Sequence, residues 1–301
     1  METRTDAASL DAASLLRTTT ARGRRVRDRL ASIWMIGSLL VAVVPLALVV
    51  GYVLVKGIRV IDVGWFTERI SVRSREPGGG MAPAIYGTLV ITGIAALMAI
   101  PLGILGAVYL HEYGRRGRLA RLIRFMADVM TGVPSIVMGL FVYTAWTLRF
   151  GLSAFGGALA LACLMLPIVI RSSEEMLRLV PDELRHASYA LGNSKWRTIV
   201  TVVLPSASGG IVSGSMLAVA RAAGETAPLL FTIGAARIVN PDVFSGPTTA
   251  LSVQIFGNAQ NPFPAAQDRA WGAALTLVAI VFLFTLAARF VSARISRRHR
   301  A

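Results

Sequence analysis

Apolar residues gather along this chain into six long blocks, separated by short polar or basic segments. A helix needs about 20 apolar residues to cross a bilayer. The blocks predict spans at about 32–55, 86–110, 125–148, 152–170, 211–233 and 271–291. Only Arg149 to Gly151 separate the third and fourth blocks, which predicts a tight hairpin there. The pattern therefore predicts an all-α, polytopic membrane protein with six transmembrane helices.

Helix breakers interrupt several of these spans, at Pro101, Pro134, Pro167 and at Gly224 with Pro228. In lipid, the backbone groups that a break frees must find partners within the protein. Such kinks therefore belong in the interior of a bundle or along a pathway, although any single one can be purely structural.

Basic residues favour alternate loops, which predicts the orientation of the spans. The second loop alone carries five arginines between residues 115 and 124, and both termini fall on the same basic side. We expect a basic, disordered cytoplasmic tail at 1–30, a transmembrane domain at 31–295 and a short cytoplasmic tail at 296–301. The protein is thus expected in the plasma (inner) membrane with both termini in the cytoplasm.

The composition supports a membrane protein, with 54% hydrophobic and only 16% charged residues. A soluble domain carries nearer a quarter charged residues. The net charge of +15 raises the possibility of nucleic-acid binding. We reject it because the basic residues lie at the ends of apolar blocks and are not interleaved with aromatic residues.

The sequence gives little support for a metal site, a disulfide or a thiolate cluster. Cys163 is the single cysteine, so it predicts neither a disulfide nor a thiolate cluster. The histidines His111, His186 and His299 are far apart and lack metal-ligand spacing. No nucleophile–base set is evident either, so we expect no metal, no cofactor and no enzymatic activity in this chain.

An ATP-binding loop is also missing from the sequence. Such a loop needs a lysine directly after a glycine, and neither Lys56 nor Lys195 follows one. Energy for active transport would have to come from a separate ATPase chain.

The fourth loop, at about 172–206, has the pattern of a short helix. Asp182 and Glu183 suit the positive N-terminus of a helix. Leu184, Ala187 and Leu191 fall at i, i+3 and i+7, which gives one small and apolar face. The loop is therefore predicted to begin with an amphipathic helix against the membrane.

A second helix is predicted directly after a sharp turn in this loop. Gly192 with Asn193 is a good helix stop, and Ser194 can cap the helix that follows. We expect Pro205 to end that second helix.

Two charges lie deep in the fifth block. Arg221 falls near the middle of the predicted span, where a charge costs at least about 2.5–3.5 kcal/mol. Glu225 is four residues on, hence on the same helix face. The pair marks either a pathway or a structural ion pair. Gly224 and the hydroxyl of Thr226 favour a pathway, as does the match between a guanidinium and an oxyanion.

The fourth loop resembles the signature loop of ABC importer permeases, which reads EAA, three residues, Gly, nine residues, I-x-L-P. This chain has His186-Ala187-Ser188, then Gly192, then Val202-Val203-Leu204-Pro205. The resemblance implies the type I ABC importer permease fold and a coupling helix in a groove of the ATPase subunit. It implies that the contact residues are Arg185, His186, Ala187, Ser188, Leu191 and Gly192. His186 departs from the family's Glu.

The fifth span resembles the phosphate importer permeases, in which R-A-x-G-E-T recurs. Here the motif is Arg221–Thr226, and the following run to Leu230 is similar to the PstA-type subunit. Segments 101–125, 132–143 and 189–200 agree, and the resemblance covers about residues 30–295. It implies a phosphate permease whose substrate pathway includes Arg221, Gly224, Glu225 and Thr226.

The same resemblance implies partners. They are a homologous second permease that completes a heterodimer, two ATPase subunits that bind ATP and Mg²⁺, and an extracytoplasmic phosphate-binding protein. Membrane lipid surrounds the spans.

Two alternatives stay open. The cargo of such a permease could be another oxyanion, namely phosphonate, sulfate or molybdate. The chain could also be a stand-alone channel or secondary transporter. The absence of an inverted repeat and the single charged pair argue against this second alternative.

For phosphate, Glu225 could accept the proton that phosphate keeps near neutral pH and repel fully deprotonated sulfate.

Overall fold

The computed structural model describes residues 22–114 and 117–298, and every regular element within these ranges is a helix. This confirms the all-α prediction. The chain divides into two compact units, Met1–Tyr52 and Val53–Ala301. Most of the expected tail at 1–30, and the end of the expected tail at 296–301, lie outside the described residues.

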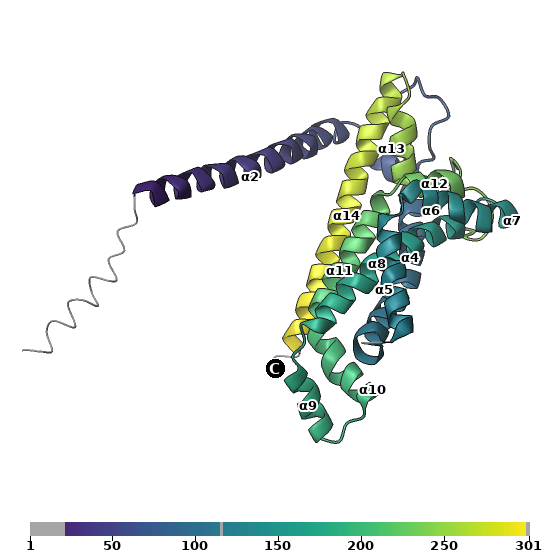
Figure 1. Ribbon diagram of the computed structural model, residues 1–301. Coiled ribbons are helices and arrows are strands. Elements are labelled where there is room, and N and C mark those ends of the chain that lie inside the picture. The colour runs from purple at the N-terminus through teal and green to yellow at the C-terminus, as the bar shows by residue number, and fades with distance from the viewer. Residues whose placement is uncertain (1–21, 115–116, 299–301) are drawn as a thin grey trace, which may run out of the picture. The chain divides into compact units, whose positions relative to one another are not determined.

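Helix α2 (Arg22–Gly57) supplies the described part of the first unit and is drawn in purple in Figure 1. It begins at Arg22, well before the predicted start of the span at residue 32. Large apolar residues occupy all of its sides, and Trp34 and Val41 are 79% and 75% exposed. A helix that is apolar all round is suited to lipid.

The second unit holds the other spans and the short helices between them. In chain order they are α3 (Val63–Thr67), α4 (Ala82–Val108), the π-helix η1 (Tyr109–Tyr113), α5 (Arg118–Gly132), α6 (Ser135–Val142), the π-helix η2 (Tyr143–Thr147), α7 (Leu148–Phe150), α8 (Ala154–Arg178), α9 (Asp182–Ala190), α10 (Lys195–Thr198), the π-helix η3 (Ile199–Val203), α11 (Leu204–Gly224), α12 (Ala227–Thr232), α13 (Leu251–Ala259) and α14 (Pro264–Arg298).

Small residues bring α4, α8 and α11 together in the core of this unit (Figure 1). Ala99 and Ala158 are fully or almost fully buried between these helices. At Gly103, an added Cβ would lie 2.6 Å from Cγ1 of Val169, so α4 and α8 are too close for a larger side chain. Close backbone approach through small residues is the usual packing of membrane helices.

The third predicted span is wrong as a single helix over 125–148. α5 ends at Gly132, α6 begins at Ser135, and the two are bent by 108°. Pro134 explains the break, because its ring disfavours a helical conformation at the preceding residue. Val133 is accordingly extended, with φ −71° and ψ 128°.

The prediction that Pro205 ends a helix is also wrong. One helical segment runs from Lys195 through Pro205 to Gly224. The π-helix η3 directly precedes Pro205. Its wider turn lets the chain continue past a residue that lacks an N–H donor. The break comes later, between Gly224 and Ala227, so the predicted continuous span at 211–233 is wrong as well.

Five helices of the described residues are long and apolar enough to cross a membrane, and the bent α5–α6 pair brings the number to six. The prediction of six spans therefore holds when the bent pair counts as one. The expected hairpin between the third and fourth spans also forms, because Gly151 adopts a φ of 84° and Ser153 caps α8.

The long segment before α4 is fixed by one arginine of α14. Arg269 is 3% exposed and donates to the backbone carbonyls of Glu76 at 2.8 Å and Ser74 at 3.3 Å. The N–H of Ile70 bonds the carbonyl of Arg237 at 3.1 Å. The polar segment before α4 thus contacts both the segment between α12 and α13 and the helix α14.

Candidate functional site

The helix of the fifth span ends where its two charges lie. Glu225 is extended, with φ −71° and ψ 127°, and follows directly on the last residue of α11. Arg221 therefore occupies the last turn of α11 and not the middle of a continuous helix. Its Nε lies 3.5 Å from Oε1 of Glu225, so the two charges meet as their spacing predicts.

The two partners differ in exposure. The side chain of Arg221 is 68% exposed and that of Glu225 only 19%. Glu225 is also held by its backbone, because its carbonyl accepts a hydrogen bond from the hydroxyl of Ser252 at 3.1 Å. The carboxylate of Glu225 thus holds one edge of the guanidinium, and within residues 22–114 and 117–298 the other donors of Arg221 have no partner.

Gly224 and Thr226, the other predicted pathway residues, flank Glu225 at the break. The carbonyl of Thr226 accepts the N–H groups of Leu229 and Leu230 at 3.1 and 3.2 Å, so Thr226 starts α12. A Cβ added at Gly224 would meet no atom within 4 Å. Gly224 therefore serves the end of the helix and is not required by close packing.

Arg221 lines a cavity of about 220 Å³ that lies against the α5–α6 break. Thr131 in the last turn of α5 lies on its wall, as do Pro134 and Ser135 at the start of α6. Pro167 of α8 lines the cavity as well. Three of the predicted helix breakers, at Pro134, Pro167 and Gly224, thus lie in or beside one site.

The first turn of α6 adds hydrogen-bond donors to this cavity wall. Among the described residues, the N–H groups of Ser135 and Ile136 have no backbone acceptor, because the chain turns away at Pro134. The positive end of a helix and a serine hydroxyl both suit an anion. This part of the cavity wall therefore favours an anion, as Arg221 does.

Tight packing fixes this turn relative to Glu225. A Cβ added at Gly139 of α6 would lie 2.5 Å from Cα of Pro228 in α12. The glycine allows the two backbones to touch, so α6 and the segment after Glu225 form one packed layer (Figure 1).

An apolar hollow of about 320 Å³ adjoins the cavity at the same break. Met130 and Val133 line both spaces, and Cys163 and Phe141 line the hollow alone. A polar and an apolar recess therefore lie next to each other at the α5–α6 bend.

The predicted coupling residues divide into two faces of α9. His186, Ala187, Leu191 and Gly192 are exposed, with Leu191 at 82%. Arg185 and Ser188 are both 5% exposed and turn inward. Two of the six residues therefore anchor this helix from within, and the other four form its outer surface.

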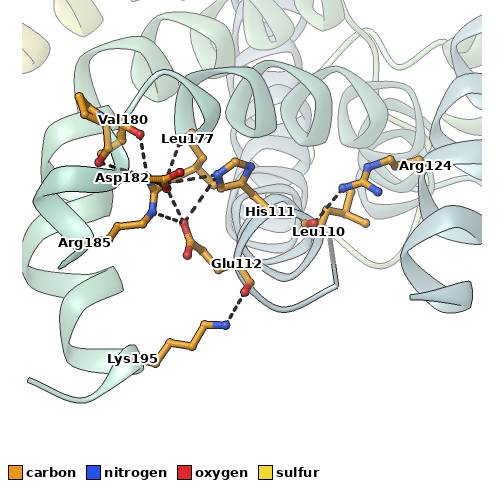
Figure 2. A network of polar contacts seen from close by, with 10 residues as sticks. Leu110, His111, Glu112, Arg124, Leu177, Val180, Asp182, Arg185 and Lys195 are labelled. Carbon is orange, nitrogen blue, oxygen red and sulfur yellow. Dashed lines mark hydrogen bonds and ion pairs between the residues drawn. The ribbon is translucent and has the colours of Figure 1, made fainter. Parts of the chain in front are cut away.

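Arg185 holds α9 in place through a dense set of hydrogen bonds (Figure 2). Its Nη2 and Nε lie 3.0 and 3.2 Å from Oε1 of Glu112. The same guanidinium donates to the carbonyls of Val180 at 2.6 Å and Leu177 at 3.1 Å, and to Oδ1 of Asp182 at 3.1 Å. One side chain therefore joins the end of α8, the start of α9 and the end of η1.

The turn after α9 forms as predicted at Gly192, where φ is 79°. No atom lies within 4 Å of an added Cβ, so the backbone conformation and not space favours glycine here. The hydroxyls of Ser188 and Thr198 lie 2.9 Å apart and fasten α9 to α10 across the turn.

Lys195 gives the turn a second attachment. Its ammonium donates to the backbone carbonyl of Glu112 and lies 4.5 Å from the ring centroid of Tyr113 (Figure 2). Both sides of the turn are thus attached to η1.

Sequence reasoning missed Thr131, Ser135 and Glu112. Thr131 and Ser135 precede Arg221 by some 90 positions and carry no motif of their own, although Pro134 between them was recognised as a kink. Glu112 showed one weak signal, an acidic residue beside an otherwise apolar block.

Comparison with known proteins gives consistent matches. Residues 99–301 match the family of binding-protein-dependent transport system inner membrane components. The chain is 48% identical to phosphate transport system permease protein PstA 1 of Mycobacterium tuberculosis, over 92% of this chain and 91% of that protein. It is 40% identical to phosphate transport system permease protein PstA of Yersinia pestis, over 90% of this chain and 92% of that one.

Solved structures share the fold at low sequence identity. A chain of the inward-facing MetNI methionine ABC transporter matches with a TM-score of 0.60 and 16% identity, over 71% of this chain and 95% of that one. A chain of a bacterial ABC transporter that imports alginate matches with a TM-score of 0.57 and 15% identity, over 90% and 99%. The fold is that of type I ABC importer permeases.

Proposed function

Because this chain belongs to the binding-protein-dependent transport system inner membrane components, and among them to the PstA-type phosphate permeases, we propose that phosphate crosses the membrane beside Arg221. The chain is a multi-pass inner-membrane permease subunit of a phosphate-importing ABC transporter. Other oxyanions are not favoured as cargo, since relatives at 40–49% identity are named for phosphate.

The exposure of Arg221 carries this proposal. Its side chain is 68% exposed although it lies in a membrane-spanning segment. Facing lipid would cost at least about 2.5–3.5 kcal/mol. The surface around Arg221 is therefore expected to face a water-filled route or a partner subunit.

The residues around the cavity suit a partly protonated phosphate. The guanidinium of Arg221 can donate to two phosphate oxygens at once. The hydroxyl and N–H of Ser135 can donate to another. Glu225 can accept the proton that phosphate retains, while it repels an anion without a proton. Recognition thus combines attraction of the anion by Arg221 with selection by Glu225 for an anion that carries a proton.

The family implies an assembly with an ATPase and a binding protein. We expect a homologous second permease to cover the open side of the Arg221 cavity and form a heterodimer. Two ATPase subunits, which bind ATP and Mg²⁺, would receive the exposed face of α9 around Ala187 and Leu191. An extracytoplasmic phosphate-binding protein would deliver the cargo. From the basic loops we expect both termini in the cytoplasm.

Uptake by the assembled transporter in proteoliposomes tests the role of Arg221. We expect Arg221→Gln to lower ATP-driven entry of labelled phosphate at least about a hundredfold, since a charged hydrogen-bonding partner of the anion is lost. Arg221→Lys should recover part of the rate, because it restores the charge without the planar fork.

The matched control is Arg237→Gln, at an exposed arginine in the segment between α12 and α13. It should leave uptake unchanged. Uptake by the Arg221→Gln complex at the wild-type rate, with equal amounts assembled, would contradict the proposal.

A further inference from the structure

The turn between α9 and α10 is linked in different ways to two of the elements that line the Arg221 cavity, α11 and α5. One of them is α11, which continues from Lys195 as a single helical segment that ends at Gly224. The other is the end of α5, and no continuous helix connects α5 to the turn. Movement at the turn reaches α11 along the helix but needs side-chain contacts to reach α5.

One set of these contacts lies at the end of η1, and a second joins α5 to α8, the helix directly before α9. The carboxylate of Glu112 pairs with Arg185 of α9, 73 positions away, and both side chains are about 5% exposed, at 4% and 6%. Two residues earlier, the carbonyl of Leu110 accepts a hydrogen bond from Arg124 of α5 at 2.8 Å (Figure 2). The short stretch from Leu110 to Glu112 therefore joins α9 to α5.

From Arg124 the connection continues along α5 to the cavity. Nε of Arg124 also lies 2.8 Å from Oε1 of Glu174 in α8, which fixes α5 sideways. Thr131 lies seven residues beyond Arg124, or about 10 Å along a helix, and it lines the cavity opposite Arg221. A displacement of η1 would therefore shift this wall.

A buried ion pair is an unusual choice for a purely structural contact here. Apolar residues of the same volume commonly stabilise a fold as well or better. Unlike an apolar contact, the Arg185–Glu112 pair fixes the orientation of the two side chains relative to each other. One carboxylate oxygen of Glu112 receives two N–H groups of the same guanidinium.

We propose that the Arg185–Glu112 ion pair is the joint that makes the α5 wall move together with the α11 wall when the ATPase moves α9. Both are positioning residues and touch no cargo. The inference rests on the proposed function, because it assumes that α9 is the contact for the ATPase. Without the joint, α11 follows the ATPase while α5 stays behind, so ATP is hydrolysed without full opening of the route.

The test measures phosphate imported per ATP hydrolysed by the assembled transporter in proteoliposomes. We expect Glu112→Gln, which keeps the shape and removes the charge, to lower this ratio about fivefold or more while ATP hydrolysis continues. Arg185→Lys should have a similar effect. The double variant should be no worse than Arg185→Lys alone, because that change already removes the pairing with Glu112.

The control is Glu76→Gln, which removes the charge from an exposed ion pair with Arg73 and should leave the ratio unchanged. A purely structural role predicts a different outcome. In that case Glu112→Gln would lower the amount of assembled complex, its ATP hydrolysis and its phosphate import to the same extent. The amount of phosphate imported per ATP hydrolysed would then stay unchanged. That outcome, or additive losses in the double variant, would overturn the proposal.

A second measurement does not depend on the cargo. Ser135→Cys in a Cys163→Ala background places one thiol at the cavity, and its labelling by a water-soluble maleimide should change on addition of ATP. Glu112→Gln should abolish that change, and persistence of the change would overturn the joint. If the wild-type complex imports no phosphate, the proposed function fails, while the labelling experiment still decides about the joint.

Discussion

Two arginines of this fold illustrate how partners separate a structural charge from one that is open to a ligand. Arg269 is 3% exposed, and its guanidinium is occupied by backbone carbonyls of residues 73–78. Arg221 is 68% exposed and, among the described residues, is paired with Glu225 through Nε. Its two terminal nitrogens therefore stay available for an oxyanion.

The carboxylate of Glu225 leads to a prediction about selectivity. Glu225→Gln should lower the preference for phosphate over sulfate about tenfold, because the repulsion of a bare dianion is lost and about 1.4 kcal/mol corresponds to that factor. The measurement is competition between labelled phosphate and sulfate for ATP-driven entry into proteoliposomes, compared between Glu225→Gln and the wild-type complex.

Glu175→Gln is the matched control for this selectivity, since Glu175 is exposed on α8 and away from the cavity. An unchanged preference in Glu225→Gln would remove the role assigned to this carboxylate.

At the level of single residues, the sequence predicted contacts between residues a few positions apart but not contacts between residues far apart in the chain. The interval of four positions predicted that Arg221 and Glu225 meet, because a helix turn brings such residues together. Thr131 and Ser135 reach the same cavity only through the packing of α5 and α6 against α8, which no local pattern encodes. Likewise, the inward direction of Arg185 depends on Glu112, a residue of another element.

At the level of helices, the prolines show the limit of sequence reasoning most clearly. Pro134 and Pro205 both interrupt apolar segments, yet one accompanies a bend of 108° and the other lies in a continuous helix. The difference comes from the preceding turns, since η3 widens the helix ahead of Pro205 whereas Val133 leaves the helical conformation. A proline in the sequence predicts that one backbone N–H donor is missing, but not whether the helix bends or continues there.

The contact between α6 and α12 gives a prediction at this scale. Gly139→Ala should destabilise the chain by about 1–3 kcal/mol, because the new methyl group would lie 2.5 Å from a backbone atom of Pro228 that cannot easily move. Thermal unfolding of the purified complex in detergent would show a lower Tm, and uptake should fall because Ser135 and Glu225 lose their relative position.

Gly93→Ala provides the comparison, since a Cβ added there meets no atom within 4 Å. It should leave both Tm and uptake unchanged. Equal Tm values for the two variants would mean that α6 and α12 are not in close contact.

At the scale of the whole molecule, one feature suggests that a single chain is incomplete. The second unit leaves Arg221, the polar cavity and the adjoining apolar hollow on an accessible surface. Hydropathy correctly predicted how many helices are able to cross the membrane, whereas the orientation expected from the arginine distribution stays a prediction. Neither could tell which face of the bundle meets lipid, because both are insensitive to how the helices are rotated.

Expression of the chain without its partners tests this incompleteness. Arg221→Leu should raise the steady-state amount of chain in the membrane about threefold, because a shift of 1–2 kcal/mol in stability commonly changes abundance several-fold. Immunoblots of membranes from cells that produce this chain alone provide the measurement.

Co-production of the proposed second permease should abolish the gain, because we expect that partner to cover the site. Arg237→Leu, on an exposed loop outside the spans, should have no effect in either setting. A gain that persists in the full complex would show that Arg221 destabilises the chain for another reason.

The π-helix at Ile199–Val203 has a consequence for how this protein can vary. An α-helix turns by about 100° per residue, whereas a π-turn spreads one turn over about one more residue. Deletion of one residue from this turn would therefore give a regular helix and leave Arg221 facing nearly the same way. Deletion of one residue farther along α11 would instead rotate Arg221 away from its cavity, so a homologue can differ in length by one residue at η3 but not between η3 and residue 221.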